Sequence, residues 1–154
     1  MAKVTFKGIN QYIAQLQRIY NTSEDQMKRA LYVGAGIVAD GIKSSMAGLP
    51  TSDPNVYYKK GVKEPGLTPE QKAELIAGFG LASMRTEDGN INTKAGFTGT
   101  SSSGVTVATL ARRAESGTSW MQKTPFIRAA VSSTKGAAEA AMKAAFDKEI
   151  SKYV

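Results

Sequence analysis

The sequence contains neither cysteine nor histidine among its 154 residues. The lack of Cys excludes disulfide bonds and thiolate metal ligands. The lack of His removes the side chain that most often acts as a general base or binds a metal ion. These two absences point away from the common hydrolase and metalloenzyme mechanisms. We therefore expect no catalytic residues, no metal site and no cofactor.

Long apolar runs are also missing. The first seven residues, Met1 to Lys7, lack the apolar core of a signal peptide. No stretch approaches the ~18 apolar residues that a membrane span needs. We therefore expect a protein without a membrane partner that is made in a cytoplasm. The chain length predicts a single domain over residues 1–154.

The polar residues form no catalytic pattern. Glu70 and Glu74 share one face of a predicted helix, which favours solvation over a shielded acid–base pair. Residues 31–39 imitate a glycine-rich dinucleotide fingerprint. That motif requires a strand before it and a helix after it, whereas these glycines fall within one helical stripe. We predict that the protein is not an enzyme.

Positive charge is in excess, with 20 basic and 13 acidic residues and a formal net charge of +7. A basic balance suits a nucleic acid, an anionic surface or an acidic protein as partner, and it also serves solubility alone. The charge by itself leaves these alternatives open.

Hydrophobic periodicity predicts four helices. They span about 10–20, 23–47, 69–77 and 125–152, with a break at Asn21-Thr22-Ser23. Capping boxes are expected where the second and third helices begin, and Thr124-Pro125 is expected to begin the fourth. Glycines in the second helix weaken it by about 1 kcal/mol each relative to Ala. Close contact with another element should offset this cost at Gly34, Gly36 and Gly41.

Alternating apolar and polar residues predict short strands at 3–7, 81–85, 91–97 and 105–110. Asp88-Gly89 is a strong signal for a hairpin turn between the second and third of them. The predicted fold class is α+β, with a small antiparallel β-sheet packed against a long second helix and a long C-terminal helix.

Residues 50–66 are predicted to form an extended loop arm, because three Pro and two Gly residues interrupt regular structure there. The arm combines aromatic and basic side chains. This chemistry suits base stacking on single-stranded nucleic acid and also an ordinary protein-binding loop. We favour protein binding, because the density of Pro and Gly indicates an exposed arm. The residues concerned are Tyr57, Tyr58, Lys59, Lys60 and Lys63.

A second polar loop precedes the last helix and holds the only tryptophan of the chain. Its basic neighbours are compatible with a DNA channel, an acidic neighbouring subunit or water, and the sequence does not choose among these. We include this loop in the candidate interface, with Arg112, Arg113, Thr118, Trp120 and Lys123.

The same loop carries a family resemblance. Glu115-Ser116-Gly117-Thr118, followed by Pro125-Phe126-Ile127-Arg128 and a long terminal helix, resembles the neck (head–tail joining or tail-completion) proteins of long-tailed bacteriophages. Phe6-Lys7-Gly8-Ile9, the glycines at 34 and 36, and Asn92 to Phe97 agree in order. Residues 48–80 differ from the family in having a longer loop and an extra helix.

The resemblance implies a virion structural protein at the head–tail junction, present in the host cytoplasm before assembly. It implies a homo-oligomeric ring of about six copies with closed symmetry. Other partners would be neck and tail proteins (adaptor, stopper, tail tube or terminator) and packaged DNA in the channel. The alternative is a basic nucleic-acid-binding protein.

Overall fold

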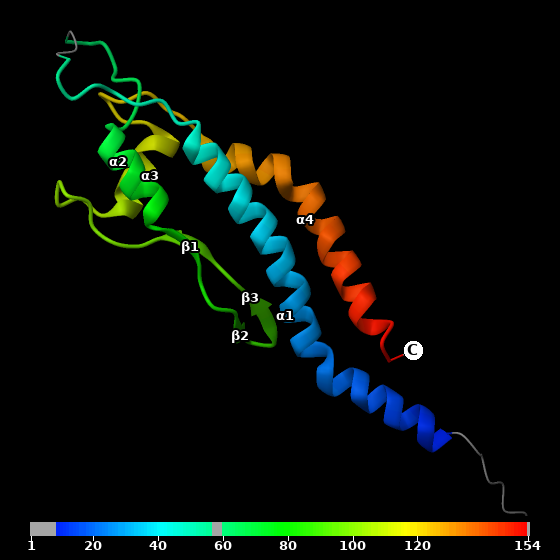
Figure 1. The fold of residues 1–154 in the computed structure, drawn as a ribbon. Helices are drawn as coiled ribbons and strands as arrows, with labels where there is room; N and C mark the ends of the chain where they lie inside the picture. Colours follow the sequence, from blue (N-terminus) through cyan, green and yellow to red (C-terminus); the bar gives the residue numbers. More distant parts are fainter. Residues whose placement is uncertain (1–8, 57–59, 154) are drawn as a thin grey trace, which may run out of the picture.

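The computed structural model describes the backbone of residues 9–56 and 60–153. Along this part of the chain two helices are followed by four short strands and then by two more helices (Figure 1), and the predicted α+β class is confirmed. The predicted strand at 3–7 lies outside the described residues. The elements are α1 (Ile9–Ala47), α2 (Pro69–Ala77), β1 (Phe79–Leu81), β2 (Arg85–Glu87), β3 (Asn90–Asn92), β4 (Ala95–Phe97), α3 (Val107–Ser116) and α4 (Phe126–Ile150).

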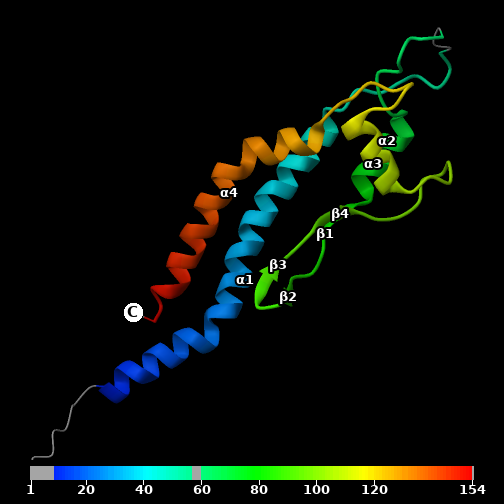
Figure 2. The same ribbon diagram turned by 180° about the vertical axis from the view of Figure 1, so that it is seen from behind.

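A long antiparallel pair of helices, α1 and α4, forms the axis of the molecule (Figures 1 and 2). Small residues allow the two helices to approach closely. A Cβ added to Gly34 would lie 2.6 Å from Sδ of Met142, and one added to Gly41 would lie 2.6 Å from Cγ2 of Thr134. The predicted close contacts at Gly34 and Gly41 are therefore confirmed. The prediction for Gly36 is wrong, because a Cβ there would meet open space.

The predicted break at Asn21-Thr22-Ser23 is wrong, because α1 is one helix of 39 residues. At 1.5 Å per residue it is about 59 Å long. The three polar residues disfavour a helix only weakly and include neither Pro nor Gly. Continuing the helix through them keeps the backbone N–H and C=O groups paired. Ser23 therefore lies inside a helix and does not cap one.

Helices α2 and α3 lie beside the end of α1 and the start of α4, and the strands run from there back along α1 (Figure 2). The buried apolar side chains concentrate around the end of α1 and the start of α4, which we call the core end. Three phenylalanines pack together there: the ring centroids of Phe79 and Phe97 are 5.2 Å apart in a tilted arrangement, and those of Phe97 and Phe126 are 6.3 Å apart and edge-on. The core comprises Ala39, Ile42, Met46, Leu49, Leu67, Leu75, Phe79, Val107, Leu110, Ala111, Ala114, Met121, Phe126 and Ala130.

The short helix α2 follows its sequence signals. Thr68 and Gln71 form the predicted capping box, with both hydrogen bonds at 3.2 Å, and Gly78 ends the helix. Lys72 from α2 donates hydrogen bonds to the carbonyl oxygens of Ala47 (2.7 Å) and Leu49 (2.9 Å). A cation at the carbonyl end of α1 complements the helix dipole and fixes α2 against α1.

The described strands form two separate ribbons. β1 pairs antiparallel with β4, and β2 pairs antiparallel with β3. The predicted turn at Asp88-Gly89 is confirmed: both residues have positive φ (51° and 76°), as a two-residue hairpin loop requires. Glu24 of α1 accepts a hydrogen bond from the Thr86 hydroxyl at 2.7 Å, which ties this hairpin to the helix pair.

The predicted strand at 105–110 is wrong, because this segment enters helix α3. Thr106 caps the helix by accepting the N–H of Thr109. The buried residues Val107, Leu110, Ala111 and Ala114 recur at helical spacing. The helical spacing of the apolar residues becomes visible only when the window extends past Leu110. Residues 105–110 taken alone have the alternating pattern of a strand.

Candidate docking surface

The two loops predicted to form the interface lie together at one end of the molecule (Figure 1). The backbone N–H of Glu64 donates to the carbonyl of Trp120 at 2.7 Å, and the N–H of Gln122 donates to the carbonyl of Glu64 at 2.9 Å. These bonds form a parallel bridge between Glu64 and Met121. The structure thus joins the arm at 50–66 to the loop at 117–124.

The arm is closed at its base. Ser52 is buried, its N–H donates to the carbonyl of Leu67 at 2.8 Å, and its hydroxyl donates to the carbonyl of Gly66 at 2.9 Å. Gly66 packs so tightly on the carbonyl of Pro50 that a Cβ would overlap it. Two fixed ends around a projecting loop are typical of an Ω-loop, a kind of segment that is often functional.

Exposed apolar side chains accompany the basic ones on these loops. Val56, Val62 and Trp120 have 51%, 56% and 46% of their surface exposed. Lys60, Lys63, Arg112 and Lys123 are also exposed. We call the loops 50–66 and 117–124, with Arg112 and Arg113, the docking surface. The predicted residues Tyr57, Tyr58 and Lys59 lie outside the described residues.

Trp120 has a defined cationic neighbour. The guanidinium carbon of Arg113 lies 5.8 Å from the centre of its ring, within the range of a cation–π contact. Arg113 comes from α3, so this contact links the loop to the core end of the subunit. The indole is held by a side chain of the same chain, while nearly half of its surface remains available to a partner.

Thr118 shapes the loop. Its hydroxyl oxygen accepts the N–H of Met121 at 2.9 Å and the N–H of Trp120 at 3.3 Å, and its own N–H donates to the carbonyl of Met121. Met121 is buried, so this turn anchors the loop in the core. The hydroxyl of Thr118, a residue that we included in the candidate interface, is thus engaged within the chain.

Glu115 caps helix α4 from a different helix, a role that sequence reasoning missed. Its carboxylate accepts the N–H of Ile127 at 2.8 Å and the N–H of Arg128 at 3.1 Å. The prediction that Thr124 caps this helix is wrong: no side chain of the N-cap position bonds there, and α4 begins at Phe126. A carboxylate at a helix N-terminus satisfies unpaired N–H groups and complements the helix dipole.

The family-like motif around this loop is therefore accounted for by local structure. Glu115 caps α4, and Gly117 has φ of +72°, with a virtual Cβ only 2.9 Å from the backbone N of Lys123. Thr118 closes the turn, and Phe126 packs in the core. The only sequence signal for the Glu115 cap was its place in this motif, because a cap contributed from twelve residues away follows no local rule.

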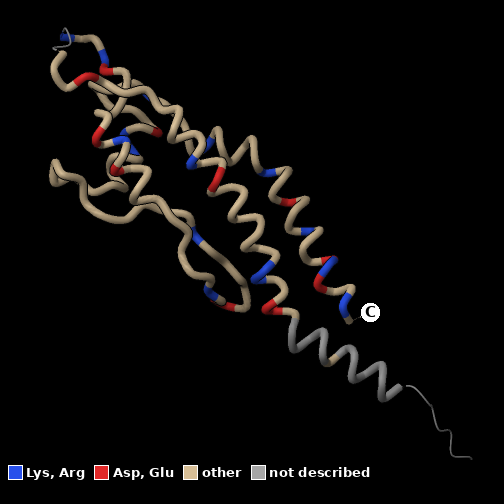
Figure 3. The backbone as a smooth tube through the Cα atoms, in the orientation of Figure 1, with Lys and Arg blue, Asp and Glu red and all other residues tan. Residues whose placement is uncertain are grey.

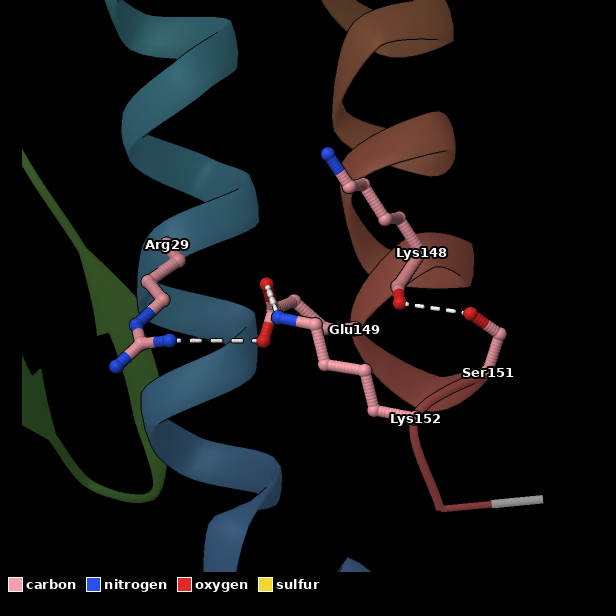
Figure 4. A network of polar contacts seen from close by, with 5 residues as sticks. All are labelled: Arg29, Lys148, Glu149, Ser151 and Lys152. Atoms are coloured by element: carbon pink, nitrogen blue, oxygen red, sulfur yellow. Dashed lines mark hydrogen bonds and ion pairs between the residues drawn. The ribbon is translucent and has the colours of Figure 1, made fainter.

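Charged groups with shifted pKa values lie away from the docking surface. The hydrogen bond from Lys152 lowers the pKa of Glu149 below its ordinary 4.5, and Arg29 and Lys148 add to the effect. The Nζ of Lys152 and NH1 of Arg29 lie 2.7 and 3.5 Å from this carboxylate (Figure 4). The hydrogen bond from Lys28 lowers the pKa of Glu24 in the same direction.

The described residues contain no group of three or more acidic side chains close enough to hold a metal ion. None of the described helices combines the length and the hydrophobicity needed to cross a bilayer. Comparison of the chain with protein-family models, with curated proteins and with solved structures finds no match.

Proposed function

We propose that this chain is a structural protein of the bacteriophage neck that joins head to tail through the docking surface. The observation that carries the proposal is the bridge between Glu64 and Met121, which fixes the two candidate loops into one surface. The resemblance of the loop and terminal helix to neck proteins supplies the biological setting. The mechanism is docking by shape and charge.

The composition of the docking surface supports protein binding. Protein interfaces concentrate aromatic and Arg anchors surrounded by a polar rim. Trp120 beside Arg113 provides such an anchor, and Lys60, Lys63 and Lys123 provide a charged rim. A neighbouring neck or tail protein with an apolar pocket and acidic surroundings would be complementary.

The proposal includes assembly of the subunit into a homo-oligomeric ring, which the resemblance to neck proteins implies.

A joining assay with purified heads and tails that lack this protein tests the proposal. We expect Trp120→Ala to melt within a few degrees of the parent, as an exposed side chain should. It should restore infectious particles about thirtyfold less well, because hot-spot aromatics contribute about 2 kcal/mol or more. Val131→Ala, an equally exposed change on α4, is the control and should join like the parent. Full joining by Trp120→Ala would contradict the docking surface.

A second candidate function is nucleic-acid binding, which the basic side chains of the same surface favour. Lys60, Lys63 and Lys123 are exposed there. Neutralising phosphates would make the affinity fall steeply with salt. Such a dependence, together with joining unaffected by Trp120→Ala, would select this alternative.

A further inference from the structure

An apolar groove runs beside the β1–β4 ribbon, away from the docking surface. Its volume is about 260 Å³. Helices α1 and α4 form one side of it and the ribbon forms the other. Its apolar lining includes Leu31, Ala35, Val38, Leu81, Ala95 and Met142. A second hollow continues it along α1 to Met27, which is 43% exposed.

The ribbon beside the groove is only two strands wide. Phe79 pairs with Phe97, Gly80 with Gly96 and Leu81 with Ala95. Within the described residues no third strand pairs with either outer edge. The Ala82 N–H bonds to Lys94 and the Thr98 N–H to Gly78, so by alternation the edge groups of Phe79, Leu81, Ala95 and Phe97 point outward. Unpaired edges are templates for another strand.

One segment of the sequence has the pattern that such an edge requires. Residues 3–7 alternate, with Val4 and Phe6 on one side and Lys3, Thr5 and Lys7 on the other. A strand added to the ribbon would place one set over the apolar groove and the other in water. Residues 1–8 lie outside the described part of the chain.

This segment cannot reach the groove of its own chain. Val4 precedes Ile9 by five residues, which span at most about 18 Å when extended. Along α1, Met27 of the second hollow is 18 residues from Ile9, or about 27 Å. Leu31, the first groove residue, is 22 residues from Ile9, or about 33 Å. Helix α1 therefore places Ile9 too far from the ribbon for residues 3–7 of the same chain to reach the groove.

We propose that residues 3–7 of one copy add as a third strand to the β1–β4 ribbon of a second copy and place Val4 and Phe6 over its groove. Main-chain hydrogen bonds at the edge would supply affinity, and the two apolar side chains would supply register. The inference rests on the self-assembly included in the proposed function. It assigns the contact between neighbouring subunits to a surface distinct from the docking surface.

Cysteine cross-linking tests this exchange cleanly, because the chain has no natural cysteine. Protein carrying Phe6→Cys is mixed under mild oxidation with protein carrying Leu81→Cys or Ala95→Cys, one on each strand of the ribbon. A disulfide needs Cα atoms within about 7 Å. We expect at least one of these mixtures to form cross-linked heterodimers. Ile76→Cys on α2, which is 38% exposed, is the control acceptor and should cross-link about tenfold more slowly, at the rate of random collision.

Two results would overturn the exchange. One is cross-linking at Ile76→Cys as fast as at both ribbon positions. The other is a monomer with an internal disulfide when Phe6→Cys and Ala95→Cys stand in the same chain. Both can be read directly from a non-reducing gel.

A matched pair of charge substitutions gives a second readout. Phe6→Asp places a carboxylate against the groove, and Thr5→Asp places the same charge on the opposite side of the strand. We expect Phe6→Asp to weaken self-association by about tenfold or more, because a buried unpaired charge is costly, and Thr5→Asp to leave it nearly unchanged. Equal effects of the two changes, or a parent that stays monomeric at high concentration, would overturn the exchange.

The outcomes separate this inference from the proposed function. Head–tail joining without ribbon cross-links would retain the neck function and reject strand exchange. Ribbon cross-links in a protein that never joins heads to tails would retain strand exchange and reject the neck function.

Discussion

Three glycines of α1 that look alike in the sequence have different surroundings. Gly41 faces Thr134, whose hydroxyl donates to the carbonyl of Ala130 at 2.7 Å. This bond holds the branched side chain, so Thr134 cannot turn away from an added methyl group. Gly34 faces the flexible side chain of Met142, which has more freedom to move. Gly36 faces open space, so only its helix propensity matters.

We therefore expect opposite effects from the same substitution. Gly41→Ala should lower the free energy of unfolding by about 1–3 kcal/mol through overpacking. Gly36→Ala should raise it by about 0.5–1 kcal/mol, because Ala is the better helix former. Denaturant unfolding measures both. Thr134→Ser removes the clashing methyl group and keeps the hydroxyl, so it should rescue much of the Gly41→Ala loss. If the effects of Gly41→Ala and Thr134→Ser on the free energy of unfolding simply add in the double variant, the contact between these two residues is contradicted.

Glu115 is the residue on which the start of α4 depends. Glu115→Ala should lower the free energy of unfolding by about 1–2 kcal/mol, because two helix N–H groups lose their acceptor. Glu115→Gln retains an acceptor oxygen without the charge, so its free energy of unfolding should lie between those of the parent and Glu115→Ala. Glu139→Ala, which removes an exposed acid within α4 itself, is the control and should change stability by about 0.5 kcal/mol or less. Equal effects of Glu115→Ala and Glu139→Ala on stability would contradict a capping role for Glu115.

Phe126 is the first residue of α4 and anchors that helix in the core. It is buried and its ring packs edge-on against Phe97. We expect Phe126→Ala to cost about 3–5 kcal/mol, as large-to-small changes in aromatic core positions do. Thermal or chemical unfolding measures the loss. Phe126→Leu, which refills part of the space, should cost less, and an unchanged denaturant midpoint for Phe126→Ala would contradict the burial.

The elements that could be predicted from the sequence are those with local signals. Thr68 and Gln71 determine the start of α2, and Asp88-Gly89 determines the β2–β3 turn. The continuity of α1 and the identity of α3 could not be predicted. The polar residues at 21–23 oppose helix only weakly, so α1 continues through them, and burial of Val107 and Leu110 selects helix where a strand fits equally well.

The far end of the helix pair is held by a carboxylate that titrates in acid. Lys152 and Arg29 lower the pKa of Glu149. The ionised carboxylate therefore stabilises the folded state at pH values above its ordinary pKa of 4.5. This contribution is lost as the pH falls through the lowered pKa. Glu149→Gln should therefore melt below the parent at neutral pH, and the difference should close in acid. A difference that stays constant from neutral pH to pH 3 would contradict the ion-pair network.

At the scale of the whole molecule, basic and acidic residues are interspersed along both long helices (Figure 3). The net charge is +7, and the described part of the backbone holds no long uninterrupted run of basic residues (Figure 3). We expect weak binding to duplex DNA with a shallow dependence on salt, since each phosphate contact adds about 0.9 to the slope of log affinity against log salt. A titration over a salt series measures the slope. A slope steeper than about −6 would favour the nucleic-acid-binding alternative.

The candidate site was predictable only in parts. Pro, Gly and exposed aromatic residues marked each loop separately, because composition is a local property. The bridge from Glu64 to Trp120 and Gln122 joins residues more than fifty positions apart and has no local signature. The same holds for Ser52, whose buried bonds close the arm across fourteen residues. Tertiary structure alone unites these segments into one surface.

The pairing of α1 with α4 also sets the order in which the chain folds. Arg29 and Glu149 are 120 positions apart, so their contact closes a very large loop and gives the fold a high contact order. During synthesis, the apolar stripe of α1 emerges from the ribosome long before its partner. Ala39, Ile42 and Met46 therefore remain without Ala130 and Phe126 until α4 has been made. Folding of the helix pair must follow the synthesis of α4, and until then the nascent chain carries an uncovered apolar helix face.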